Sequence, residues 1–165
     1  MNEHELTAFG APFLPGLLGI VLDEAEPGRV VAHLDVQEHH LAPHRFLHAA
    51  TVIGLADTAC GYGCIVSLPE GGTSFTTIEL KSNFLRTARE GTISCEAQLV
   101  HGGRTTQIWD ATVSTPDGRP MALFRCTQLM LRASSARAVS GTVPEKCQSR
   151  CQSSARHCYA FVTEK

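Results

Sequence analysis

The chain has 165 residues, of which 43% are apolar and 18% are charged, and its formal net charge at pH 7 is -2. This length and composition are typical of one globular domain with a hydrophobic core. The lack of a basic surplus argues against nucleic-acid-binding and membrane-surface proteins. The acidic start MNEHELTAFG lacks the basic residues and apolar run of a secretory signal. We therefore expect a cytoplasmic protein with no nucleic-acid or membrane partner.

The beginning of the chain has the pattern of a short helix followed by a hairpin. We expect the helix near residues 3–9. Residues 16–26 and 30–38 flank the turn signal Glu26-Pro27-Gly28, and the second run, with VVAHLDV, alternates apolar and polar residues. This pattern predicts two paired strands.

Residues 49–67 are predicted to form the one long helix of the protein. They are mainly apolar, and the stop signal LPEGG follows them. Four β-rich runs, at residues 74–86, 92–101, 105–115 and 120–131, are separated by short turns, which predicts an antiparallel meander. One helix against a six-stranded antiparallel sheet is a two-layer α+β domain, here over residues 1–132. One sheet cannot cover a helix that is apolar on nearly all sides, so we expect a second copy to cover the remainder.

The composition changes after residue 132. Residues 133–165 lose periodicity and are rich in Ser, Ala and Arg, which predicts a disordered C-terminal tail. The cysteines of this tail are Cys147, Cys151 and Cys158. With His157 they could be drawn as a zinc site, but their spacing matches no strong zinc pattern. The other four of the seven cysteines are expected to be small core residues.

The predicted central helix contains a single formally charged side chain, that of Asp57. Ionised side chains are rarely buried without a partner or a function, so Asp57 is expected to do chemistry. The residues at helical spacing from it are all small, namely Ala50, Gly54, Gly61 and Cys64. Small neighbours would leave a cavity beside the carboxylate. The alternative is a stripe that packs across a dimer interface, where Asp57 bonds to a partner's backbone.

A histidine-rich loop, HHLAPHRFLH at residues 39–48, precedes this helix. The first amides of a helix have no intrahelical partner and lie at the positive end of its dipole. The N–H groups of Ala49 and Ala50 should therefore point outward and bind an oxyanion. Asp57, two turns further along, is expected to lie near the reacting carbon.

The same histidines raise the possibility of a metal site. His44 and His48 are four residues apart, but they share a face only if both are helical, and Pro43 disfavours this. A hydrogen-bonding role for His48 and solvated positions for His39 and His40 are the favoured alternative.

Two motifs resemble those of a known family. The run from Pro43 to Thr58 is similar to the P-x-G-x-x-H-G-G…L-x-D signature of hotdog-fold acyl-CoA thioesterases of the phenylacetate-degradation (PaaI-like) group. The run TTIELKSNFLR, from Thr76 to Arg86, resembles the T-x-E-L-x-x-N-F-L-R segment of that family. The resemblance covers roughly residues 13–132. It implies a hotdog fold, with the sheet wrapped around the helix, and a homodimer or homotetramer with shared active sites.

The resemblance also implies roles for individual residues. Asp57 would be the catalytic residue, as general base or nucleophile, Ala49 would supply the oxyanion-binding N–H, and His48 would brace the loop. Substrate contacts would come from Thr58 and Gly61, from Thr77, Ser82 and Asn83 on the neighbouring subunit's strand, and from Arg86, Arg89 and Arg104 at the coenzyme A phosphates. Each of these three arginines could equally lie at a solvated strand edge.

The loop departs from the family pattern. The family commonly has Asn at the position of Ala42 or of His44, and this chain has none in the loop. Arg45 stands at the glycine position, and alanines replace the two glycines after His48. Alanine keeps the backbone N–H. Two alternatives follow from the missing Asn: catalysis is weak, or His44 takes over its polar role.

The sequence therefore predicts a metal-independent acyl-CoA thioesterase that needs no cofactor beyond the coenzyme A of its substrate. One alternative is a non-catalytic acyl-CoA-binding hotdog module, in which Asp57 is a structural remnant. Another is an enoyl-CoA hydratase. The D-x-N-P-x-H loop expected of that enzyme is matched by residues 35–40, DVQEHH, only at the Asp and the His.

Overall fold

The computed structural model describes residues 1–132, so the predicted tail, with its cysteines and His157, lies outside the described residues. The expected helix, hairpin, central helix and four later strands are all present. The elements α2 and η1 were not predicted, and α2 takes up the start of the expected run 16–26 because Pro15 favours the first turn of a helix. In chain order the elements are α1 (Glu3–Gly10), α2 (Leu14–Leu17), β1 (Ile20–Glu26), β2 (Arg29–Asp35), the 3-10 turn η1 (Glu38–His40), α3 (Ala49–Val66), β3 (Gly72–Phe84), β4 (Thr92–Gly102), β5 (Thr106–Ser114) and β6 (Pro120–Arg132).

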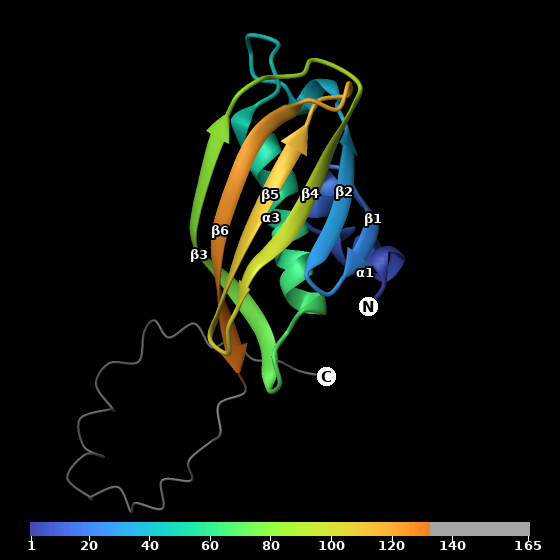
Figure 1. Cartoon of the computed structure of the whole chain (residues 1–165). Helices are drawn as coiled ribbons and strands as arrows, with labels where there is room; N and C mark the ends of the chain where they lie inside the picture. The colour runs from blue at the N-terminus through green and yellow to red at the C-terminus, as the bar shows by residue number, and fades with distance from the viewer. Residues whose placement is uncertain (133–165) are drawn as a thin grey trace, which may run out of the picture. The chain divides into compact units, whose positions relative to one another are not determined.

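The strands form one six-stranded antiparallel sheet in the order β1-β2-β4-β5-β6-β3 (Figure 1). The predicted sheet is confirmed, but the simple meander is wrong for one strand, because β3 pairs with β6 and not with β4. Short turns join β4, β5 and β6, whereas residues 85–91 carry the chain across the end of the sheet from β3 to β4. As a result, β1 and β3 are the two edge strands.

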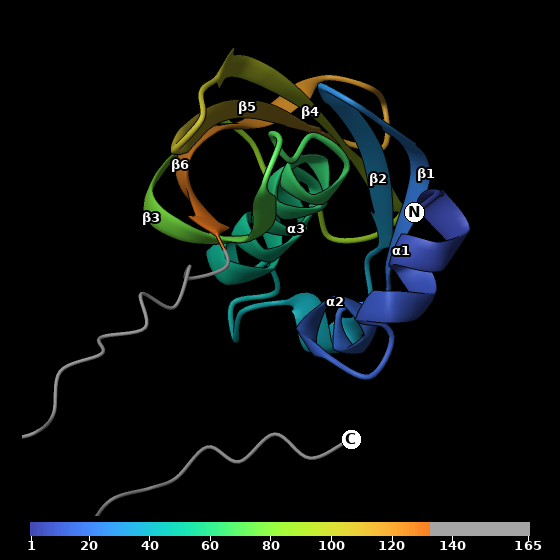
Figure 2. The ribbon, with the colours of Figure 1, turned by 90° about the horizontal axis from the view of Figure 1, so that it is seen from below.

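The sheet curves around α3, which lies in its concave face (Figure 2). This confirms the predicted wrapped sheet. Two helix glycines lie directly beneath aromatic rings: a Cβ at Gly63 would be 2.5 Å from the Trp109 ring, and one at Gly61 would be 2.8 Å from the Phe75 ring. The glycines therefore permit close packing of helix and sheet. Although α3 is long and apolar enough to span a membrane, it is the core helix of this domain.

The first half of α3 is less covered than the second. Ala49 and Ala50 are exposed, and Ile53 is half-buried. On β3, Leu80 and Phe84 pair with buried residues of β6 and so share the inner face of the sheet, yet they are 41% and 46% exposed. An apolar surface therefore remains open beside the beginning of the central helix.

Candidate active site

The loop before α3 is shaped by backbone hydrogen bonds. The Ala42 N–H donates to the Phe46 carbonyl and the Arg45 N–H to the Ala42 carbonyl, each over 2.8 Å. Leu47 N–H donates to the Ala88 carbonyl, which ties the loop to the β3–β4 connection. Arg45 has a φ of 65°, a left-handed conformation that glycine adopts more easily. The loop thus keeps its turn although arginine stands at the family's glycine position.

His48 caps the beginning of α3. Its Nδ1 accepts the Ala50 N–H over 3.0 Å, and its backbone carbonyl accepts the Thr51 N–H over 3.0 Å. Within residues 1–132, the Ala49 amide is the one N–H of the first helical turn without a hydrogen-bond partner. The prediction that the Ala50 amide is free is therefore wrong, because the histidine cap occupies it. The geometry leaves Ala49 as the candidate donor to a substrate oxygen.

The exposed Ala49 lines a cavity of about 380 Å³. At its rim, the His44 ring packs edge-on against Phe46 at 5.3 Å, and the Arg89 guanidinium lies 4.5 Å above the same phenyl ring. The interior is mainly apolar. Sequence reasoning did not single out Val52 and Met121, because only the fold brings α3 and β6 together here. The full lining is Ala42, His44, Phe46, Leu47, His48, Ala49, Val52, Phe84, Arg86, Thr87 and Met121.

Asp57 lies in a polar network further along the same helix. The Thr77 hydroxyl lies 3.2 Å from Asp57 Oδ1 and 3.0 Å from Gln128 Oε1. Burial raises the pKa of the half-buried Asp57, and the hydrogen bond from Thr77 acts in the opposite direction. The helix glycines do not leave the cavity that the sequence predicted beside the Asp57 carboxylate. Leu18 fills the space at Gly54, and Phe75 fills the space at Gly61.

Ala49 and Asp57 do not meet within one chain. They are eight residues apart on α3, which separates them by about 12 Å along the helix axis. Reacting groups must approach within about 3–3.5 Å of each other. The expectation that Asp57 lies near a carbonyl held at Ala49 is therefore wrong for a single protomer.

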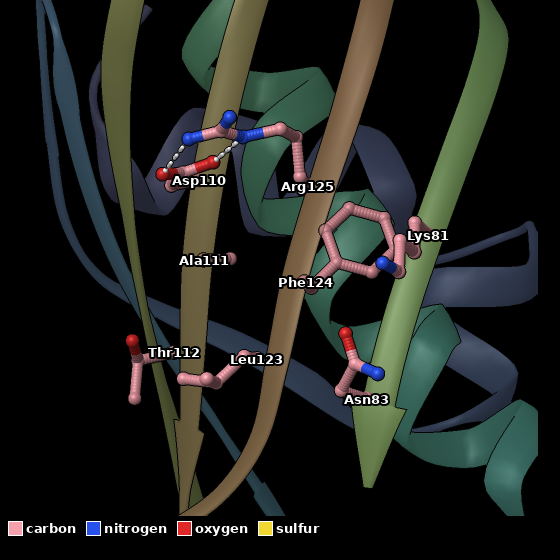
Figure 3. A pocket seen from close by; sticks show the side chains of 8 residues that line it. All are labelled: Lys81, Asn83, Asp110, Ala111, Thr112, Leu123, Phe124 and Arg125. Carbon is pink, nitrogen blue, oxygen red and sulfur yellow. Dashed lines mark hydrogen bonds and ion pairs between the residues drawn. The ribbon is translucent and has the colours of Figure 1, made fainter.

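The three candidates on β3 are divided between the two faces of the sheet. Thr77 contacts Asp57 of its own chain, and Ser82, paired with the buried Phe124, has a buried hydroxyl without a partner within residues 1–132. Asn83 lies on the opposite face, where it lines a hollow of about 360 Å³ with Lys81 (Figure 3). The structure therefore does not bring Asn83 together with Asp57 within one chain, and its predicted place at a neighbouring subunit's site stays a prediction.

The two predicted helix contacts are placed differently. Thr58 is half-buried, next to Asp57 in the chain. Gly61 is buried next to the Phe75 ring and is not open to a substrate within one chain.

Two of the three predicted arginines lie at the cavity. Arg86 lines it and donates to the Pro120 carbonyl over 2.7 Å, and Arg89 stacks on Phe46. Arg104 lies beyond the other end of β4, about 35 Å away along an 11-residue strand. It lines a separate hollow with Glu70 and Arg132. Within one protomer, the basic rim of the cavity consists of Arg86 and Arg89.

His40 and the four cysteines within residues 1–132 are buried in the domain. His40 is buried, not solvated as expected, because its carbonyl accepts the His48 N–H and the Thr51 hydroxyl. Within residues 1–132, no group of three or more His, Cys, Asp or Glu is arranged to hold a metal ion. The predicted core position of four cysteines is confirmed. Cys60, Cys64, Cys95 and Cys126 are buried and free.

The sequence shows which known proteins this chain is similar to. Residues 44–122 match the family model of the thioesterase superfamily. An acyl-coenzyme A thioesterase, PaaI, of Escherichia coli is 31% identical over 66% of this chain and 75% of that protein. The chain belongs to the thioesterase superfamily. A 1,4-dihydroxy-2-naphthoyl-CoA hydrolase of Listeria monocytogenes is 27% identical to this thioesterase, over 67% of this chain and 89% of the relative.

Solved structures agree with this assignment of the thioesterase. A variant of a Pseudomonas aeruginosa thioesterase superposes with a TM-score of 0.76 at 26% identity, over 80% of this chain and 95% of the other. The E. coli PaaI structure superposes with a TM-score of 0.70 at 26% identity, over 78% and 89%. The thioesterase is thus an α+β hotdog-fold protein and a thioester hydrolase.

Proposed function

We propose that this thioesterase hydrolyses acyl-CoA thioesters in the cytoplasm, without a metal or other cofactor. The observation that carries the proposal is that Ala49, whose N–H has no partner within residues 1–132, lines an apolar cavity of about 380 Å³ at the positive end of α3. Two relatives whose names state a CoA thioester as substrate support this choice.

In the proposed mechanism, the thioester carbonyl oxygen accepts a hydrogen bond from the Ala49 N–H. The bond strengthens as the oxygen gains negative charge, and the loss of one such donor typically lowers the rate about 10²–10³-fold. The His48 cap holds the first turn in place, because it occupies the neighbouring amide of Ala50. The oxyanion is thereby directed to Ala49.

Asp57 supplies the second group, in one of two ways. As a general base it takes a proton from water, whose oxygen then attacks the carbonyl carbon. As a nucleophile its carboxylate attacks the carbon directly, and water afterwards hydrolyses the mixed anhydride. In both cases the C–S bond breaks, the thiolate of coenzyme A takes up a proton, and the free acid is released. The raised pKa of Asp57 makes it a stronger base than an ordinary aspartate.

The site is completed by a second copy of the chain. Ala49 and Asp57 are separated by about 12 Å within one protomer, so a two-fold-related protomer has to bring its Asp57 to the cavity. The edge strand β3, with exposed Ile78, Leu80 and Phe84, is the surface that suits such pairing. The resulting homodimer, or a homotetramer built from two of them, has shared active sites.

The rim of the cavity suits the charged part of the substrate. Arg86 and Arg89 lie at the end of the sheet where the cavity opens. Guanidinium groups bind phosphates through paired hydrogen bonds, so these residues would hold the phosphates of coenzyme A. The apolar lining would then hold uncharged parts of the substrate near Ala49.

The test is release of free thiol from a panel of aromatic, short-chain and long-chain acyl-CoAs. Wild type is expected to release coenzyme A from at least one class, and Asp57→Asn to lower kcat at least about 10²-fold. Asp110→Asn is the matched control, because Asp110 pairs with Arg125 on the outer face of the sheet. Tight binding without thiol release by wild type would support a non-catalytic module, and full turnover by Asp57→Asn would refute the role of this carboxylate.

A further inference from the structure

A buried amide lies behind the hydroxyl that contacts Asp57. Gln128, on β6, is fully buried, and its Oε1 lies 3.0 Å from Thr77 Oγ1. Its Nε2 lies 3.3 Å from Cys126 Sγ. Together with the 3.2 Å contact between Thr77 and Asp57, these contacts link four side chains into one continuous hydrogen-bond chain. This hydrogen-bond chain runs from the core of the sheet to the carboxylate on α3.

The Thr77 hydroxyl has one hydrogen and two acceptors within reach, so it donates to only one of them. An ionised carboxylate is the stronger acceptor. When Asp57 is ionised, the hydrogen therefore points to Asp57, and Gln128 has to present its NH2 group to Thr77 Oγ1. A half-turn of the amide achieves this, because it exchanges the oxygen and the nitrogen. The amide oxygen then faces Cys126, whose thiol can donate to it.

Protonation of Asp57 reverses the direction of every bond. The carboxylic acid donates to Thr77 Oγ1, the Thr77 hydroxyl donates to Gln128 Oε1, and Gln128 Nε2 donates to Cys126 Sγ. All four groups are satisfied in both states, which matters because an unsatisfied buried polar group is costly. A glutamine can serve both states because its amide carries a donor and an acceptor at one position.

We infer that Gln128 is a positioning residue, which acts through Thr77 to stabilise the ionised form of Asp57. Without the amide, the Thr77 oxygen has no donor behind it, and its hydroxyl is less firmly directed at the carboxylate. The consequence for catalysis rests on the proposed function. The hydrogen-bond chain itself does not, since it depends only on the contacts among these side chains.

The surroundings of Asp57 leave the hydrogen-bond chain through Thr77 as the principal stabiliser of the carboxylate charge. The nearby titratable groups are the thiols of Cys60 and Cys64 on α3 and Cys126 on β6. Burial raises the pKa of Cys64 to about 12, so this thiol is neutral at physiological pH. On β4 the corresponding buried group is the thiol of Cys95. Within residues 1–132, the charged side chains of β1 to β6 occupy exposed or half-buried positions, and α2 has none.

The experiment measures the pH dependence of kcat/KM and, without substrate, the NMR titration of the Asp57 carboxyl carbon. Gln128→Met and Thr77→Val are each expected to raise the pKa of Asp57. Because the ionised form is the active one, the acidic limb of the profile moves to higher pH, by about one unit for Thr77→Val and less for Gln128→Met. Thr77→Ser keeps the hydroxyl and should leave the limb in place. The double variant should match Thr77→Val alone, because Gln128 acts through Thr77.

Thr127→Val is the matched control, since Thr127 precedes Gln128 in the chain but bonds to Glu79. If Gln128→Met is not folded, Gln128→Asn replaces it, because the shorter amide cannot reach Thr77. A variant of Gln128 that lowers kcat but leaves both the limb and the NMR titration unchanged would overturn the inference. If the NMR shift is found but wild type releases no thiol from any acyl-CoA, the hydrogen-bond chain stands and the proposed function fails.

Discussion

The two halves of α3 are packed in opposite ways. Residues of the second half lie under aromatic rings of the sheet, with Trp109 against Gly63 and Phe75 against Gly61. The first half carries the exposed Ala49 and the half-buried Asp57, and an open cavity adjoins its start. The sheet thus anchors one half of the helix and leaves the other half open, where we propose that substrate and a second protomer bind.

This difference allows one helix to serve both the fold and the proposed chemistry. The rigid contacts of the second half hold the helix axis, so the amide at its start and the carboxylate two turns later keep fixed positions. Their separation within one chain shows that fixed positions alone do not complete a site. In the proposed dimer, another copy supplies the missing group to the open half.

The largest effect is expected on thiol release, when the Ala49 N–H is removed in one variant and the Asp57 carboxylate in another. Ala49→Pro removes the N–H at a position where proline is tolerated, because it is the first residue of the helix and His48 is extended. Ala49→Pro and Asp57→Asn should each lower thiol release about 10²–10³-fold. In a mixture of both variants, a heterodimer has one intact site, so activity should return to about a quarter of wild type.

The control for this complementation is each variant mixed with itself. Mixing should be done by co-expression or by refolding together, so that subunits exchange. No recovery in well-mixed heterodimers would mean that Ala49 and Asp57 do not act across the interface.

A smaller effect is expected on stability from adding a methyl group to each half of the helix. Gly63→Ala places a Cβ within 3.0 Å of three atoms of the buried Trp109 ring. Such overpacking should lower the free energy of unfolding by about 1–3 kcal/mol. Gly54→Ala meets only the end of the flexible Leu18 side chain, and the helix propensity of alanine offsets that contact by about 1 kcal/mol. Urea unfolding of both variants checks the contrast, which equal losses would contradict.

The smallest effect is expected on stability, from substitutions of Arg45 in the loop before α3. Arg45 is in the left-handed region, where a non-glycine residue is strained by about 1 kcal/mol. Its ion pair with Glu38 is exposed and contributes little. Arg45→Gly should therefore be more stable to urea than Arg45→Ala by about 0.5–1 kcal/mol, since both lose the ion pair and only glycine relieves the strain. Equal midpoints would show that the loop tolerates the left-handed conformation without cost.

Local patterns were sufficient to predict most of the elements. The hairpin around Pro27-Gly28, the helix that ends before Pro69 and the strands separated by glycine turns all appear where short-range chemistry indicated. The lone charge of Asp57 and the helix start at Ala49 also follow from the sequence, because burial rules and helix ends are local properties.

The contacts between distant segments depended on the tertiary structure. Only the fold places β3 at the edge beside β6, which brings Thr77 and Gln128 to Asp57 and carries Asn83 to the other face. Only the fold separates Arg104 from the cavity at Arg86. The reason is that strand order and sheet curvature arise from packing around α3, whereas turn signals and periodicity report on neighbours in the chain. The sequence by itself determined which residues are candidates for the chemistry, and the tertiary structure decided which of them meet within one chain.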